Sequence, residues 1–151
     1  MTLNSNSITE IDLSGLVNLE ILYLDNNQLT EIDLSELANL KVLDLGFNQL
    51  RGVDLSGLVN LAELRLWENQ LTEIDLSELV NLEYLHLDNN ILDVDYIIKI
   101  IPENENILPK LERCDLFFGK YRKYNKQEER EKLYLENKSK FNMMRKKSAM
   151  K

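Results

Sequence analysis

The sequence predicts an α/β fold: a right-handed solenoid with a short parallel sheet on its concave face, turns or 3₁₀ segments on its convex face and a C-terminal helix. Two observations lead to this prediction. A stretch of 21 residues recurs along the chain, so that Leu19 aligns with Leu40 and Leu61, and self-similarity at this period is typical of stacked repeats. Within each copy, leucines alternate as at Leu22 and Leu24, which indicates a short strand with one buried face.

Each repeat follows the spacing LxxLxLxxNxL, which runs from Leu19 to Leu29 and includes Asn27 in the first complete copy. This spacing resembles the leucine-rich repeat family over roughly residues 1–92. The resemblance implies a solenoid in which the asparagine position is structural. A side-chain amide both donates and accepts hydrogen bonds, so an asparagine at the turn after each strand is expected to bridge successive turns. The aligned asparagines are Asn6, Asn27, Asn48, Asn69 and Asn90.

The second half of each repeat, LTEIDLSELANL in the copy that ends at Leu40, is predicted to form the convex side. Its apolar residues return to the core, and Ser35 is expected to cap a short turn. An aspartate recurs two residues before this serine position, at Asp12, Asp33, Asp54 and Asp75. This column has two interpretations, cation binding or local pairing with backbone and serine groups. Local pairing is preferred because no glycine-rich loop would shape the oxygens around an ion, and no metal site is assigned.

The chain divides into three parts. Residues 1–92 hold the regular repeats, the first of them partial. Residues 93–119 are predicted to form a longer irregular final repeat with a helix, and residues 120–151 a charged helical cap with a basic tail. The segments YIIKII, LPKLERCD and EEREKL resemble the C-terminal cap of SDS22-like leucine-rich repeat proteins. At the other end a half-repeat opens the solenoid without a regular cap. The alternatives are that the short polar stretch TLNSNS blunts the strand edge, that a second chain covers it, including end-to-end association, or that the chain is part of a longer protein.

Composition indicates a chain with a packed core and no membrane span. No apolar run approaches the ~20 residues of a spanning helix, and no apolar leader begins the chain. A single cysteine, Cys114, fits a reducing compartment, so an intracellular, cytoplasmic location is expected, with the nucleus as an alternative. Residues 1–100 carry 18 acidic and 4 basic residues, whereas residues 101–151 carry 8 acidic and 14 basic residues. The acidic repeats disfavour nucleic acid, and a monomer is expected.

No pattern in the sequence points to catalysis or to a cofactor. The sequence has no phosphate-binding glycine loop, no cluster of metal ligands and no nucleophile elbow. His86 and Cys114 are a pair suited to thiol and imidazole chemistry. The repeat alignment places His86 on the outward face and Cys114 in the core, so the two are expected on opposite sides of the sheet. We therefore expect neither an enzyme nor a small-molecule substrate.

The positions at which the repeats differ lie on the outward face of the predicted strands. Trp67 and Arg65 are informative there because tryptophan, tyrosine and arginine dominate binding energy at protein interfaces. The candidate residues for partner binding are Tyr23, Asp44, Phe47, Arg65, Trp67, Tyr84, His86 and Asp88. The alternative is a structural cross-strand row in which Asp44, Arg65 and His86 satisfy one another.

These observations favour a non-enzymatic interaction module that binds a protein or peptide on its concave sheet face. One alternative is that the basic C-terminal tail binds an anionic ligand, either RNA or a membrane surface. Another is that the repeats form the recognition domain of a larger effector.

Overall fold

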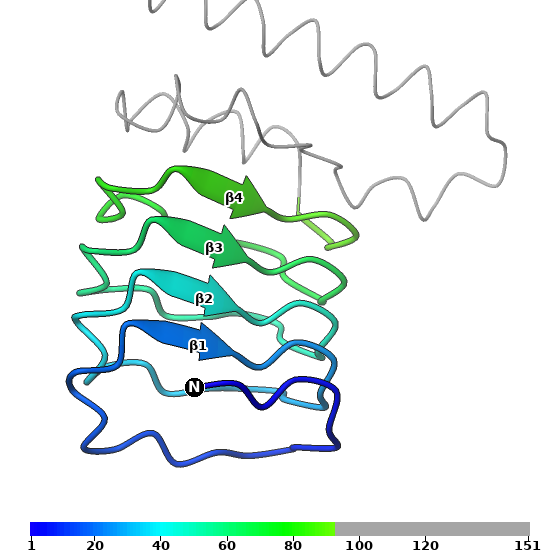
Figure 1. The fold of residues 1–151 in the computed structure, drawn as a ribbon. Helices are drawn as coiled ribbons and strands as arrows, with labels where there is room; N and C mark the ends of the chain where they lie inside the picture. The colour runs from blue at the N-terminus through cyan, green and yellow to red at the C-terminus, as the bar shows by residue number, and fades with distance from the viewer. Residues whose placement is uncertain (93–151) are drawn as a thin grey trace, which may run out of the picture.

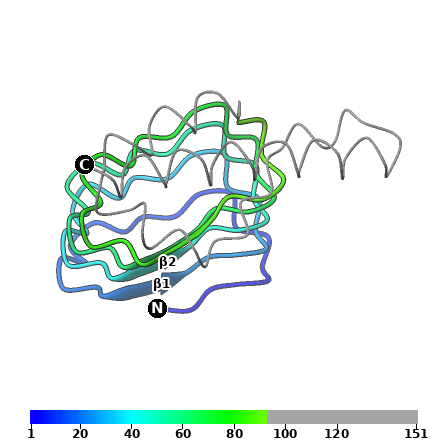
Figure 2. The same ribbon diagram turned by 90° about the horizontal axis from the view of Figure 1, so that it is seen from above.

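The repeats stack as successive turns of one coil, and the turns that follow the N-terminal one each contribute one short strand to a parallel sheet (Figure 1). The computed structural model describes residues 1–92. Its four strands are β1 (Ile21–Tyr23), β2 (Val42–Asp44), β3 (Glu63–Arg65) and β4 (Tyr84–His86), and they pair in the order β1-β2-β3-β4. Seen from above, the turns lie over one another (Figure 2). The predicted solenoid with a parallel sheet is therefore confirmed for this part of the chain.

The strand register follows the repeat length. Leu22 pairs with Leu43, and Leu43 with Leu64, so equivalent residues of adjacent repeats are direct neighbours. The half-repeat at the N-terminus joins the sheet through a single parallel bridge between Thr2 and Tyr23. Met1 thus falls beside β1, as the repeat alignment predicts.

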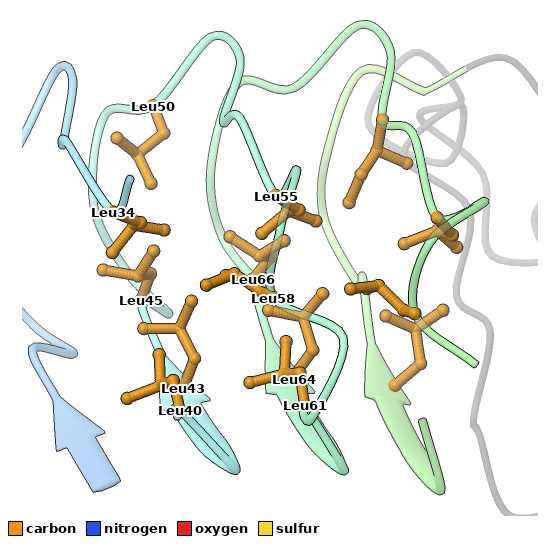
Figure 3. Close-up of a cluster of buried hydrophobic side chains, with 14 of the residues drawn as sticks. Leu34, Leu40, Leu43, Leu45, Leu50, Leu55, Leu58, Leu61, Leu64 and Leu66 are labelled. Atoms are coloured by element: carbon orange, nitrogen blue, oxygen red, sulfur yellow. The ribbon is translucent and has the colours of Figure 1, made fainter. Parts of the chain in front are cut away.

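The core is a stack of leucines enclosed by each turn. Leu43 and Leu45 from the strand region meet Leu34 and Leu50 from the rest of the same turn, and all four are buried. The next turn repeats this arrangement with Leu55, Leu58, Leu61, Leu64 and Leu66 (Figure 3). Each turn buries its apolar side chains against its neighbours, which explains why stacked copies are needed for a core.

A column of asparagines holds the turns together just after the strands. Asn48 donates from Nδ2 to the carbonyl oxygens of Leu24 and Leu45, each at 3.1 Å, and its Oδ1 accepts a hydrogen bond from the backbone N–H of Leu29 at 3.0 Å. Asn27, Asn69 and Asn90 make equivalent contacts and are all buried. The predicted bridging role of the asparagine position is confirmed.

The side opposite the sheet consists of single turns. Leu37 donates to the carbonyl of Leu34 at 3.0 Å, and the equivalent bond recurs in the other repeats. Oδ1 of Asp33 accepts the backbone N–H of Ser35 at 2.9 Å, which holds the start of this turn. A capping serine hydroxyl would accept the N–H of a later residue, so the capping role expected of Ser35 stays a prediction.

Two further contacts on this side were not predicted. A second column of asparagines links the turns: Asn39, Asn60 and Asn81 each donate to the carbonyl of the residue 22 positions earlier, at 2.8 to 2.9 Å. In addition, Gly15 donates its N–H to Oε2 of Glu36 at 2.6 Å, and Gly57 does the same to Glu78 at 2.7 Å. Both glycines have positive φ, which a glycine adopts without steric cost.

Several predictions concern residues outside the described part. The longer final repeat at 93–119, the helical cap and basic tail at 120–151, and the position of Cys114 all lie there. Residues 1–92 contain no helix, so this part of the chain has no helix that could cross a membrane.

Candidate interaction surface

The outward side of strands β1 to β4, called the sheet face below, carries the predicted site residues. The register places Tyr23, Asp44, Arg65 and His86 side by side in one row across the four strands. Two residues beyond this row, where each strand has ended, lie Asp25, Gly46, Trp67 and Asp88 at equivalent positions of their repeats. The repeat length of 21 residues therefore determines which variable side chains become neighbours.

Arg65 lies at the centre of a group of charged and aromatic contacts. Its guanidinium forms ion pairs with Glu63 on its own strand and, at 3.6 Å, with Asp44 on β2. It also lies 5.1 Å from the ring centre of Tyr84 on β4, within the range of a cation–π contact. Partial burial lowers the pKa of Arg65, but the carboxylates of Glu63 and Asp44 outweigh this and raise it. Arg65 therefore ties three adjacent strands together and stays charged.

Asp44 lies beneath this group. It is 8% exposed, and its Oδ1 accepts the backbone N–H of Gly46 at 3.0 Å. Burial raises the pKa of Asp44, with a further contribution from the nearby charge of Asp25, although the hydrogen bond from Gly46 and the charge of Arg65 act in the opposite direction. Asp44 is thus placed to position Arg65, with little surface left for direct contact with a partner.

Four rings lie in contact on the sheet face, and this aromatic cluster consists of Phe47, Trp67, Tyr84 and His86. Trp67 is tilted against Phe47, with ring centres 5.9 Å apart, and stacks on His86 at 6.1 Å with an interplanar angle of 22°. Tyr84 meets His86 edge to face at 6.4 Å. These separations fall in the range of favourable aromatic pairs. The cluster spans three repeats and brings together four of the predicted site residues.

Trp67 leans over the adjacent turn and covers Gly46. A Cβ atom at position 46 would lie 2.0 Å from Nε1 of Trp67, so no side chain fits there. Gly46 is the one member of its row of repeat positions without a side chain, and it is buried as a consequence. The alignment of Gly46 with Trp67 in adjacent repeats is the signal in the sequence that corresponds to this contact.

Phe47 is both exposed and conformationally unfavourable. Its side chain is 52% exposed, and its φ of 54° lies in the left-handed region. The equivalent residues of the other repeats, Ser5, Asn26, Glu68 and Asn89, take the same conformation, and asparagine tolerates it far better than a bulky residue does. This backbone position therefore does not favour phenylalanine, whose ring packs on Trp67 while about half of the side chain stays exposed.

Asp88 and Tyr23 are the two predicted residues that have not yet been placed. Nε2 of His86 lies 3.0 Å from Oδ2 of Asp88, so the carboxylate beside His86 belongs to Asp88. The sequence had offered, as an alternative to binding, a structural row in which His86 pairs with Asp44 and Arg65. Of that alternative, only the pair of Arg65 with Asp44 is formed. Tyr23 lies on β1 at the far edge of the row, and among residues 1–92 no ring contact joins it to the aromatic cluster.

The acidic column on the opposite side is locally paired. Asp12, Asp33, Asp54 and Asp75 each accept the N–H of the serine two residues later, at 2.8 to 2.9 Å. Hydrogen bonds from these serines lower the pKa of all four aspartates. In the part of the chain that the structure describes, no group of three or more histidine, cysteine or acidic residues is arranged to hold a metal ion.

The fold and the surface together define a solenoid repeat protein with an aromatic, charged sheet face. The pattern described as "Leucine Rich repeats (2 copies)" matches residues 17–58 and 59–99, more than half of the chain. The chain belongs to the leucine-rich repeat family, which confirms the resemblance found in its sequence. Proteins of this family generally mediate protein–protein interaction. No curated protein sequence matches the chain.

Several solved structures share the fold. The leucine-rich repeat protein LIC12759 of Leptospira interrogans is 31% identical over 70% of this chain, with a TM-score of 0.64. The functional domain of InlJ from Listeria monocytogenes, which includes a cysteine ladder, is 32% identical over 62% with a TM-score of 0.55, and the internalin InlF of that species is 31% identical over 67% with the same score. The chain spans 21% to 31% of their lengths. None of these similarities supports the SDS22-like interpretation of the C-terminal cap.

Proposed function

We propose that this protein is a non-enzymatic interaction module whose sheet face binds a protein or peptide through the aromatic cluster and Arg65. The observation that carries the proposal is Phe47, which is 52% exposed in a left-handed conformation. The same conformation recurs at Ser5, Asn26, Glu68 and Asn89, so the repeat imposes it, and position 47 is the one of these five that carries an aromatic side chain. Next to Phe47 lies Trp67, and tryptophan and arginine are the side chains most often responsible for binding energy at interfaces.

The size of the surface fits a peptide or a small protein contact. Four strands at a spacing of about 4.8 Å span roughly 15 to 20 Å, so the face offers less than the ~800 Å² per partner of a standard interface. Tyr84 and His86 extend the aromatic surface beyond Trp67, while Asp44 holds Arg65 in place from below. The proposal includes a monomer that acts inside the cell, which fractionation and light scattering would test.

An affinity pull-down tests the proposed function. The intact chain, a Trp67→Ala/Arg65→Ala variant and a control variant, Val59→Ser, are compared as baits. Val59 is a suitable control because it is 43% exposed and lies outside the sheet face. We expect a partner that the intact chain and the control retain and that the double variant loses by at least about tenfold, the effect of ~1.4 kcal/mol. Equal retention by the double variant, folded as judged by circular dichroism, would show that another surface binds.

A further inference from the structure

The charge of the sheet face indicates what kind of partner it takes. We propose that the aromatic cluster binds an extended protein segment that carries lysine or arginine side chains on both sides of an apolar residue. This inference rests on the proposed function and adds the chemical class of the partner to it.

The sheet face has an excess of negative charge. It carries the carboxylates of Asp25, Asp44, Glu63, Glu68 and Asp88 against the single arginine Arg65. Arg65 is already engaged by Glu63 and Asp44, so it does not offset the others. The wider surroundings have the same sign, because residues 1–92 contain 16 acidic and only 3 basic residues. A basic partner segment is attracted to such a face, and an acidic one is repelled.

Two carboxylates in the row of repeat positions that contains Trp67 lie on either side of the indole. Asp25, Gly46, Trp67 and Asp88 occupy one repeat position in four successive turns, and the indole covers the second and third of these places. Asp25 and Asp88 are therefore the carboxylates at the two ends of the row. Both are partly exposed, and they lie three strand spacings apart, about 14 Å. An extended peptide covers that distance in about four residues, so basic side chains at positions i and i+4 would meet both carboxylates.

The rings between the two carboxylates suit the rest of such a segment. Phe47 and Trp67 present apolar surface for a side chain at the middle position, and ring faces also attract the ammonium or guanidinium group of a neighbouring basic residue. The long apolar stems of lysine and arginine pack on aromatic surface while their charged ends reach a carboxylate. One segment can therefore use the aromatic and the acidic residues at the same time.

A selection from a library of random peptides tests the class of the partner. The full-length protein is the target, and binders that also bind Trp67→Ala are removed. We expect the remaining sequences to be enriched in lysine and arginine, at a spacing of about four residues around an apolar position. Enrichment of neutral or acidic sequences would overturn this inference and leave the proposed function intact. If no binder depends on Trp67, the inference and the proposed function both fail.

Point variants then test the role of the two carboxylates with one selected basic peptide as the probe. Asp25→Asn and Asp88→Asn should each weaken binding about two- to fivefold, as expected for exposed ion pairs, and raising sodium chloride from about 50 to about 300 mM should weaken it further. Asp54→Asn is the matched control, since Asp54 lies among the turns opposite the sheet and should leave affinity unchanged. Equal affinity in all three variants would contradict the proposal. Self-association that Trp67→Ala abolishes would instead assign the face to a second copy of the chain.

Discussion

The indole of Trp67 occupies the space in which a side chain at position 46 would begin, so Trp67 and Gly46 act as one unit across two adjacent turns. This relationship controls the direction in which the indole points. With a larger residue at position 46, Trp67 would have to leave its present place beside Phe47 and His86.

Replacement of Gly46 should therefore act through Trp67. Gly46→Ala is expected to destabilise the protein by roughly 1 to 3 kcal/mol, as overpacking does, but to cost little in a Trp67→Ala background. Urea unfolding of the four members of this cycle measures the coupling. Because the chain has a single tryptophan, its fluorescence emission reports the displacement directly. An equal loss of stability in both backgrounds would show that Gly46 is needed for a reason other than Trp67.

Phe47 should be replaceable without loss of stability. Phe47→Asn removes an aromatic contact worth ~0.5 to 1.5 kcal/mol and relieves left-handed backbone strain of ~1 to 2 kcal/mol, so the free energy of unfolding should change by less than about 1 kcal/mol. Binding of the partner should nevertheless fall. Phe47→Ala is the control, since it loses the ring and keeps the strain, and it should be less stable than Phe47→Asn. A large loss of stability in Phe47→Asn would mean that the residue is structural.

The asparagine column should show a graded response to mutation. Asn48→Ala leaves the N–H of Leu29 and the carbonyls of Leu24 and Leu45 without their side-chain partner, which should cost roughly 2 to 4 kcal/mol. Asn6→Ala is the matched control, because Asn6 is exposed and bonds only within its own turn. Thermal unfolding of both variants measures the difference. Similar melting temperatures would contradict the bridging role.

Stability should decrease in acid because of the aspartate column. Hydrogen bonds lower the pKa of Asp33 and its equivalents below 3.8. Their contribution to the free energy of unfolding is therefore present at higher pH and is lost as the pH falls through the lowered pKa values. Asp33→Asn keeps the acceptor for Ser35, and it should flatten the dependence of unfolding free energy on pH between about pH 5 and pH 2.

Asp44 provides the opposite control for this experiment. Because the pKa of Asp44 is raised, its contribution to the free energy of unfolding is present below pH 3.8 and is lost as the pH rises through the raised pKa. Asp44→Asn should therefore make the free energy of unfolding fall more steeply in acid. A change of the same sign in Asp33→Asn and Asp44→Asn would show that these hydrogen bonds and burial do not set the two pKa values.

Much of the fold was predictable because it depends on periodicity alone. Alternating leucines such as Leu43 and Leu45 can all be buried only if the repeats stack in register. The asparagine after each strand lies where the same backbone groups need a hydrogen-bond partner in every turn. The same alignment favoured local pairing of the aspartate column, and Asp33 does accept the N–H of Ser35. The capping role of the Ser35 hydroxyl stays a prediction, because it depends on backbone geometry that the repeat pattern does not determine.

The arrangement of the sheet face was predictable only in part. The register correctly made neighbours of Arg65 and Asp44, which form an ion pair. It could not show that Trp67 covers Gly46 or that His86 lies beside Asp88, because these contacts depend on side-chain rotamers. The column of Asn39, Asn60 and Asn81 was visible in the repeats but was overlooked beside the leucines.

The alternation of Gly15 with Glu36 and of Gly57 with Glu78 has a consequence for how the array can be shortened or extended. Each glycine N–H needs a glutamate in the next turn. Removal of one 21-residue turn would place glycine beside glycine or glutamate beside glutamate, whereas removal or duplication of two consecutive turns would preserve the partners. The smallest interchangeable module of this protein is therefore a pair of turns, although the leucine spacing repeats with every single one.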